Sequence, residues 1–361
     1  MGQPNSICRF DRRWLIQTAA AALGLSAMPY AVGQQADGQK KGPPADFDMA
    51  AYLSGISAKG KAAGYKEVVY KKTPQGELRM YLVLPEGWSA QDRRAAVVYF
   101  YGGGWSGGNV FSYNEQSAYM AKCGVVGCMA DYRVRTRHGV TPDKCVEDAR
   151  SAVRWIRGHC QELGVDSNRV IAGGGSAGAH IAACTAVATA PNSESDDLSI
   201  SCTPNGLLLC FPPTTVVENE RGSQARKLLG DDMALRLSPA SHVTKAWPPT
   251  VQFFGTADRL LTGGVLLHNR MRAAGVRCEL YLAEGQGHGF VNMDPWNVVT
   301  SKYAAEFLMT AGLFEKTKLP EAPSDSLRRY DGEPLDKIMI QTTENPSRKL
   351  LEERKRGGKA K

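Results

Sequence analysis

Short, continuous apolar runs alternate with longer amphipathic segments along residues 64–314. We interpret the apolar runs as strands, because they are short and are bounded by glycine or proline. Runs that are apolar throughout indicate strands buried on both faces, as in a parallel sheet. The expected strands are 67–70, 78–84, 95–101, 124–130, 169–172, 206–211, 250–254 and 278–282.

The segments between these runs predict helices. The clearest covers 143–159, where Val146, Ala149, Val153 and Ile156 recur at three- and four-residue spacing. This alternation predicts the α/β class, with a mostly parallel, doubly wound sheet of about eight strands and helices on both faces. The other expected helices are 177–190, 263–274 and 297–313.

The start of the chain has the layout of an export signal. Arg9, Arg12 and Arg13 precede an apolar stretch, 14–28, which is too short to span a bilayer comfortably. Small residues then predict cleavage near Gly33, and the paired arginines also suit the twin-arginine route. We therefore expect export to the periplasm or the medium, by the Sec or twin-arginine route, without stable membrane insertion after cleavage.

The net charge of +8 is unevenly distributed: residues 345–361 hold seven Lys and Arg against two Glu. A basic tail of this kind is typical of solvated chain, and the remainder is nearly neutral, so charge predicts no nucleic-acid partner. The expected layout is a signal peptide (1–33), a linker and approach (34–63), a folded body (64–314) and a polar, basic tail (315–361).

Of the nine cysteines, only Cys8 falls in the expected signal. The remaining even number permits disulfides in an exported chain, but their pairing cannot be read from the sequence. Twin-arginine cargo folds in a reducing compartment, which argues against disulfides, and the alternative is that the cysteines are small, buried, apolar side chains. The sequence shows no Cys and His spacing typical of a metal site, and we expect no metal or organic cofactor.

Residues 174–178 read Gly-Gly-Ser-Ala-Gly, between an expected strand and an expected helix. This context is the one in which a G-x-S-x-G sequence forms a nucleophile elbow. The N-terminus of the following helix would direct free N–H groups at the reaction centre. The alternative is a glycine-rich turn in which Ser176 is only the helix N-cap.

A nucleophilic serine needs a base, and the base needs an acid to orient it. Asp258 and His288 each follow an expected strand, and the carboxyl ends of parallel strands are where α/β sheets collect their sites. The order Ser176, Asp258, His288 predicts a catalytic triad. Asp294 does not follow a strand, and His180, inside the elbow helix, is expected to pack there.

Residues 101–108, YGGGWSGG, follow the expected strand 95–101. Acyl transfer develops an oxyanion, and backbone N–H groups that stabilise it must approach closely. A triple glycine permits that approach, so the sequence predicts an oxyanion hole here. Residues 101–108 are called the oxyanion loop below. The alternative is a flexible surface turn.

Together these stretches resemble the α/β-hydrolase superfamily, and more narrowly the hormone-sensitive-lipase-like carboxylesterases and the secreted acetylxylan and feruloyl esterases. The segments that carry the resemblance lie between about 100 and 292: YGGGWSGG, ADYRV, CVEDARSAVRWIR, GGGSAGAH, GTADRLL and GHGFVN.

The resemblance implies that Ser176 is the nucleophile, that His288 is general base and then acid, and that Asp258 orients His288. It also implies oxyanion donors and supporting residues. The donors would be the N–H groups of Gly103, Gly104 and Ala177, and the loop would be supported by Tyr101, Gly102 and Asp131.

Two positions depart from the resemblance. Tyr101 stands where relatives usually have histidine, and Gly175 stands where lipase-like relatives place an acidic residue. The second departure favours the polysaccharide-esterase group. Five aromatic side chains are candidates for lining an acyl or sugar cleft: Trp105, Phe111, Tyr113, Phe290 and Trp296. Loop 190–206 is a candidate for covering that cleft.

The sequence therefore predicts a secreted serine hydrolase that cleaves short-chain carboxylic esters, with acetyl or feruloyl esters on polysaccharide as candidate substrates. The alternatives are a prolyl-oligopeptidase-like serine peptidase and a non-catalytic binding protein of the same fold. The oligomeric state is left open.

Overall fold

A computed structural model describes residues 47–339, except 217–219, 316 and 324–326. Every described residue belongs to one compact unit of the chain. The expected signal peptide and cleavage site lie outside the described residues, as does the basic segment 345–361.

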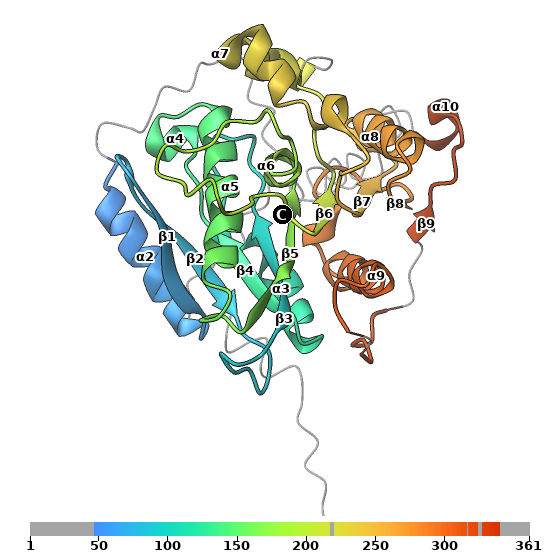
Figure 1. The fold of residues 1–361 in the computed structure, drawn as a ribbon. Coiled ribbons are helices and arrows are strands. Elements are labelled where there is room, and N and C mark those ends of the chain that lie inside the picture. Colours follow the sequence, from blue (N-terminus) through green and yellow to red (C-terminus); the bar gives the residue numbers. More distant parts are fainter. Residues whose placement is uncertain (1–46, 217–219, 316, 324–326, 340–361) are drawn as a thin grey trace, which may run out of the picture. The chain divides into compact units, whose positions relative to one another are not determined.

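The strands of the described residues form one nine-stranded sheet in the order β1-β2-β4-β3-β5-β6-β7-β8-β9 (Figure 1). The central run from β4 to β8 is parallel, while β1, β2 and β9 pair antiparallel at the two edges. The strands are β1 Lys66–Thr73, β2 Gly76–Val83, β3 Arg94–Phe100, β4 Val126–Ala130, β5 Val165–Gly175, β6 Gly206–Cys210, β7 Thr250–Gly255, β8 Cys278–Ala283 and β9 Leu327–Arg329.

Helices cover both faces of the sheet (Figure 1). In β3, Val98 and Phe100 join a core that includes α5 and α6, whereas Val97 and Tyr99 join a core that includes α3 and α9. Alternate residues of a strand point to opposite faces, so a continuously apolar strand fills two cores. The helices are α2 Met49–Ala62, α3 Asn114–Lys122, α4 Arg135–His138, α5 Pro142–Gly158, α6 Ala177–Cys184, α7 Glu220–Arg236, α8 Leu261–Ala273, α9 Trp296–Thr310 and α10 Leu335–Ile338, with 3-10 turns η1 Val110–Tyr113, η2 Pro239–His242 and η3 Phe290–Asn292.

Each of the eight expected strands and four expected helices is present, although α6 ends at Cys184 and not at 190, and further elements lie outside the expected folded body, 64–314. The expected linker 34–63 contains α2, whose first turn is capped by the Asp48 carboxylate accepting a hydrogen bond from the Ala51 N–H at 2.9 Å. The expected tail 315–361 contains β9, which pairs with β8, and it buries Tyr330 and Ile338. Weak local patterns were overridden here by tertiary contacts.

Loop 190–206 does not cover the carboxyl ends of the strands; it is bound along α5. Arg150 and Arg154 are both buried and both donate to the Asn192 side chain. Arg154 also pairs with Asp196 at 2.8 Å. Side chains four residues apart lie on one face of a helix, so these arginines share the face that binds the loop.

All eight cysteines of the described residues are free thiols, and six of them are buried. This agrees with the alternative in which they act as small apolar side chains. Among the described residues, no helix combines the length and apolar character that a bilayer crossing requires.

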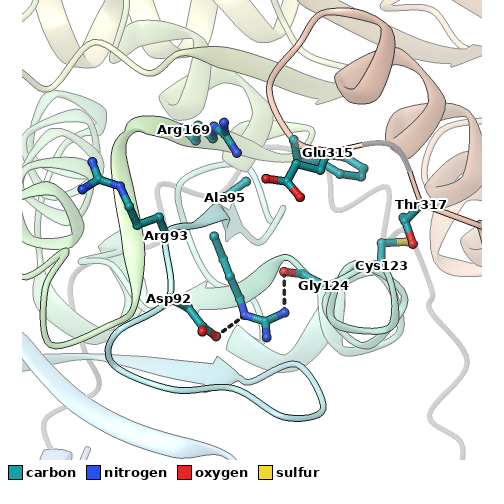
Figure 2. A pocket seen from close by; sticks show the side chains of 10 residues that line it. Asp92, Arg93, Ala95, Cys123, Gly124, Arg169, Glu315 and Thr317 are labelled. Atoms are coloured by element: carbon teal, nitrogen blue, oxygen red, sulfur yellow. Dashed lines mark hydrogen bonds and ion pairs between the residues drawn. The ribbon is translucent and has the colours of Figure 1, made fainter.

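A cavity of about 460 Å³ lies at the amino end of β3 (Figure 2). Its most enclosed cation, Arg94, is already paired with Asp92 at 2.5 Å and donates to the Gly124 carbonyl. The oxyanion loop follows the opposite end of β3. The length of β3 therefore separates this cavity from the expected catalytic residues.

Candidate active site

The structure brings Ser176, Asp258 and His288 together from the ends of three strands. Ser176 Oγ lies 2.9 Å from His288 Nε2, and His288 Nδ1 lies 2.7 Å from Asp258 Oδ2. A carboxylate can only accept, so Nδ1 carries the proton and Nε2 is left to accept from the serine hydroxyl. This is the arrangement in which a histidine can act as a general base toward serine.

Asp258 is held in place by its own loop. The residue is 2% exposed, and its second oxygen, Oδ1, accepts from the Leu260 N–H at 2.9 Å. Phe211, at the end of β6, places its ring edge against the His288 imidazole, with ring centroids 4.6 Å apart. The imidazole is thus fixed by Asp258 on one nitrogen and by Phe211 against its ring. Phe211 was not identified from the sequence.

The backbone of Ser176 confirms a sharp turn between β5 and α6. Its φ of 53° and ψ of −123° lie in a region that residues with side chains seldom adopt. Ser176 occupies the N-cap position of α6, but its side chain makes no capping hydrogen bond there, so capping does not account for this serine. The turn instead directs Oγ away from the helix and toward His288.

The oxyanion loop passes beside this turn. Gly103 has a φ of 137°, and a Cβ there would lie 2.1 Å from the Gly107 carbonyl oxygen, so the position requires glycine. Among the described residues, no acceptor is found for the N–H groups of Gly103, Gly104 or Ala177. Ala177 begins α6, where first-turn N–H groups have no partner inside the helix.

Tyr101 supports the loop through its hydroxyl. The hydroxyl donates to Asp131 Oδ1 at 2.6 Å and accepts from Arg137, which also pairs with Asp131. Arg137 in turn donates to the Gly108 carbonyl at the end of the loop. Burial, together with the Asp131 charge, raises the pKa of Tyr101 well above its ordinary value, so the hydroxyl stays neutral. Arg137 was not identified from the sequence, because no local pattern distinguishes it from other arginines.

Gly102, the third expected support, lies directly against the nucleophile. A Cβ at this position would lie 3.3 Å from the Ser176 Cβ. The start of the loop therefore contacts the elbow by packing, while Tyr101 holds it from the other side.

We expect Tyr101→Phe to lower kcat for ester hydrolysis about 3- to 10-fold. One hydrogen bond to a charged partner is worth about 1.5–3 kcal/mol, and losing it would displace the oxyanion loop and so weaken stabilisation of the transition state. The Asp131–Arg137 pair remains, so the protein stays folded. The measurement is kcat and KM on a p-nitrophenyl ester, with Tyr303→Phe, in α9, as the control. Unchanged kcat would mean that the ring alone supports the loop.

His180 is fully buried, in agreement with its expected packing role. Its Nε2 donates to the Leu237 carbonyl at 2.7 Å, and its Nδ1 accepts from the Trp105 indole N–H at 3.2 Å. Burial lowers the pKa of His180 to about 4, so the imidazole is neutral at neutral pH.

This pKa predicts that the protein is less stable in mild acid. The native state binds fewer protons than the unfolded chain wherever the folded pKa is depressed, so stability is complete above about pH 6.5 and falls as the pH drops toward 4. From His180 alone we expect the free energy of unfolding to be about 2 kcal/mol lower at pH 5 than at pH 7. Urea unfolding at both pH values measures this. The decrease should be smaller in His180→Gln, and an equal decrease would contradict the assignment.

Most of the aromatic side chains expected to line a cleft lie in the hydrophobic core or pack against it. Phe111 packs against Tyr81, Tyr113 stacks on Tyr99, and Trp296 packs edge-on against Phe290. Trp105 remains in the oxyanion loop. Aromatic side chains dispersed along a sequence have no local mark that separates core from cleft.

Comparisons with known proteins agree with this geometry. The alpha/beta hydrolase fold family matches residues 97–292. Carboxylesterase NlhH of Mycobacterium tuberculosis is 27% identical over 233 residues, which are 56% of this chain and 68% of that protein. The acetylxylan esterase of Xylanibacter ruminicola is 25% identical over 279 residues, 73% of this chain and 53% of that protein.

Among solved structures, esterase Est2 of Thermogutta terrifontis with propionate bound is 37% identical, with a TM-score of 0.67, over 71% of this chain and 97% of that one. Est2 was also solved with butyrate bound. These relatives and structural neighbours are esterases, and together with the family match they establish the coarse activity. The chain is a carboxylic ester hydrolase, and it belongs to the alpha/beta hydrolase fold family.

Proposed function

We propose that this protein is an exported serine esterase that hydrolyses short-chain esters through an acyl-enzyme on Ser176. The observation that carries the proposal is the unbroken chain of hydrogen bonds from Ser176 Oγ through His288 to the buried Asp258. A serine with this base and this acid is an activated nucleophile.

In the first half of the reaction, Ser176 Oγ attacks the acyl carbon while His288 Nε2 takes its proton. The resulting oxyanion accepts hydrogen bonds from the N–H groups of Gly103, Gly104 and Ala177. His288 then gives the proton to the departing alkoxide, and the alcohol leaves. In the second half, His288 takes a proton from water, the hydroxide attacks the acyl-enzyme, and the carboxylic acid leaves as the proton returns to Ser176.

Two observations support a small acyl group. A Cβ at Gly175 would lie 2.0 Å from the Tyr113 hydroxyl and 3.0 Å from the Phe211 ring, so these side chains fill the space beside the elbow. The similar esterase Est2 has been solved with propionate and with butyrate. Acetyl esters on polysaccharide are the natural substrate that we propose, with feruloyl esters as the second choice; the relative named acetylxylan esterase supports the first.

Rates on p-nitrophenyl esters from acetate to palmitate, on acetylated xylan and on aminoacyl amides test the proposal. We expect kcat/KM to be highest for acetate to butyrate and to fall steeply for longer chains. Faster cleavage of the amides would favour a peptidase, and preference for palmitate would favour a lipase. Location of the full chain in cell fractions tests export, which retention in the cytoplasm would contradict.

A further inference from the structure

Within the described residues, only three residues other than glycine have a positive φ: Trp105 at 59°, Ser176 at 53° and Phe211 at 41°. Each of the three comes from a different strand-end loop: Ser176 belongs to the hydrogen-bonded triad, Phe211 contacts His288, and Trp105 lies in the oxyanion loop. Such a backbone costs about 1–3 kcal/mol and persists only where its surroundings enforce it. Ser176 is explained by the elbow and Phe211 by its contact with His288. Trp105 has no role in the reaction described above.

The Trp105 side chain connects the oxyanion loop to the helix that carries the nucleophile. Its indole N–H donates to His180 Nδ1 at 3.2 Å, and the two rings meet edge to face at 83° with centroids 5.1 Å apart. His180 lies in the first turn of α6, where its N–H donates to the Ser176 carbonyl at 2.9 Å. The connection therefore runs from the loop to the backbone of Ser176 itself.

The geometry of His180 permits this bond in one direction only. Its Nε2 donates to the Leu237 carbonyl at 2.7 Å, and the Cys184 thiol lies 3.6 Å from the same nitrogen. In a neutral imidazole the other nitrogen can then only accept. The buried His180 ring is held by hydrogen bonds on both nitrogens, so it can fix the position of the oxyanion loop through Trp105.

The backbone of the loop is held on its other side by α4. The Arg135 N–H donates to the Trp105 carbonyl at 3.0 Å, and the Thr136 N–H donates to the Ser106 carbonyl at 3.0 Å. Trp105 thus has its backbone tied to α4 and its side chain tied to α6. The donor glycines, Gly103 and Gly104, directly precede this doubly anchored residue.

We propose that Trp105, through His180, is a positioning residue that sets the oxyanion donors relative to Ser176. The inference rests on the proposed esterase function. An oxyanion forms only in the transition state and the tetrahedral intermediate, so misplaced donors lower kcat and leave substrate binding nearly unchanged.

The test is Trp105→Phe, which keeps an aromatic ring and removes the indole N–H. We expect kcat on p-nitrophenyl butyrate to fall about 10-fold while KM changes less than 2-fold. The affinity for a trifluoromethyl ketone, which forms a tetrahedral adduct with serine, should fall by a similar factor. If Trp105 had only a structural role, the variant would instead have a lower melting temperature, and its folded fraction would keep the wild-type kcat and KM.

The chain contains a matched control. Trp155 stacks on His159 in and after α5, with ring centroids 4.2 Å apart, and the pocket that both residues line includes no residue of the triad or the oxyanion loop. Trp155→Phe should leave kcat and the ketone affinity unchanged. If Trp105→Phe behaves like Trp155→Phe, the inference is wrong.

A double-mutant cycle tests the route through His180. We expect His180→Leu to lower kcat as Trp105→Phe does, and the double variant to be no worse than either single variant, because contacting residues are not additive. His180→Gln keeps an acceptor and a donor and should retain more activity than His180→Leu. Multiplicative losses would exclude the route. If His180→Leu does not fold, the comparison of Trp105→Phe with Trp155→Phe still decides.

Failure of this inference is distinct from failure of the proposed function. A wild-type chain without esterase activity, or one whose activity survives loss of Ser176, refutes the function. A wild-type esterase that depends on Ser176 but tolerates Trp105→Phe refutes only the positioning role.

Discussion

Ser176→Ala is expected to reduce kcat/KM for every ester substrate by about 10⁴- to 10⁶-fold. Alanine removes the Ser176 hydroxyl, whose Oγ lies 2.9 Å from His288 Nε2 and is the attacking atom. The remaining rate would come from bound water and the oxyanion donors, which retain part of the rate enhancement without the nucleophile. Purified variant and wild type are compared on p-nitrophenyl acetate, with active-site titration to exclude contamination.

The loss should be catalytic and not structural. Ser176 Oγ makes no capping bond to α6, so its removal leaves the helix intact, and the melting temperature should change by no more than a few degrees. Ser199→Ala, at an exposed serine whose hydroxyl donates to Asp197, serves as the control and should keep full activity. Full activity in Ser176→Ala would show that another residue is the nucleophile.

Asp258→Asn is expected to lower kcat about 10⁴-fold with little change in KM. The asparagine can retain the bond from the Leu260 N–H through its amide oxygen. Its NH₂ group would then face His288 Nδ1, where Oδ2 now lies at 2.7 Å. Because an NH₂ group donates, Nδ1 must lose its proton, and the proton moves to Nε2, which can no longer accept from Ser176.

The control for this variant is Asp294→Asn, at an exposed aspartate that does not follow a strand. It removes the same charge and should leave kcat within 2-fold of wild type. Circular dichroism and a melting curve establish that both variants are folded. A similar loss in both would mean that the overall charge near the site, and not the tautomer of His288, governs the rate.

The fold was predictable where local pattern and tertiary environment agree. A strand such as β3 is apolar at every position from 95 to 100 because both of its faces are covered, and that pattern is visible without coordinates. The elements that were missed are those with a weak local pattern. β9 is only three residues long and mostly exposed, so it forms through its pairing with β8.

The order of the elements could be predicted from the sequence alone, and so could the placement of Ser176, Asp258 and His288 after parallel strands. Parallel strands end at the same edge of the sheet, so residues that follow them must meet there. Only packing in three dimensions brings further side chains to the triad and the oxyanion loop: Arg137 to Tyr101, Phe211 to His288, and His180 to Trp105. Trp105 and His180 are 75 residues apart. Their contact depends on how α4, α6 and the end of β3 pack together, and a hydrogen bond set by packing leaves no periodic mark in the chain.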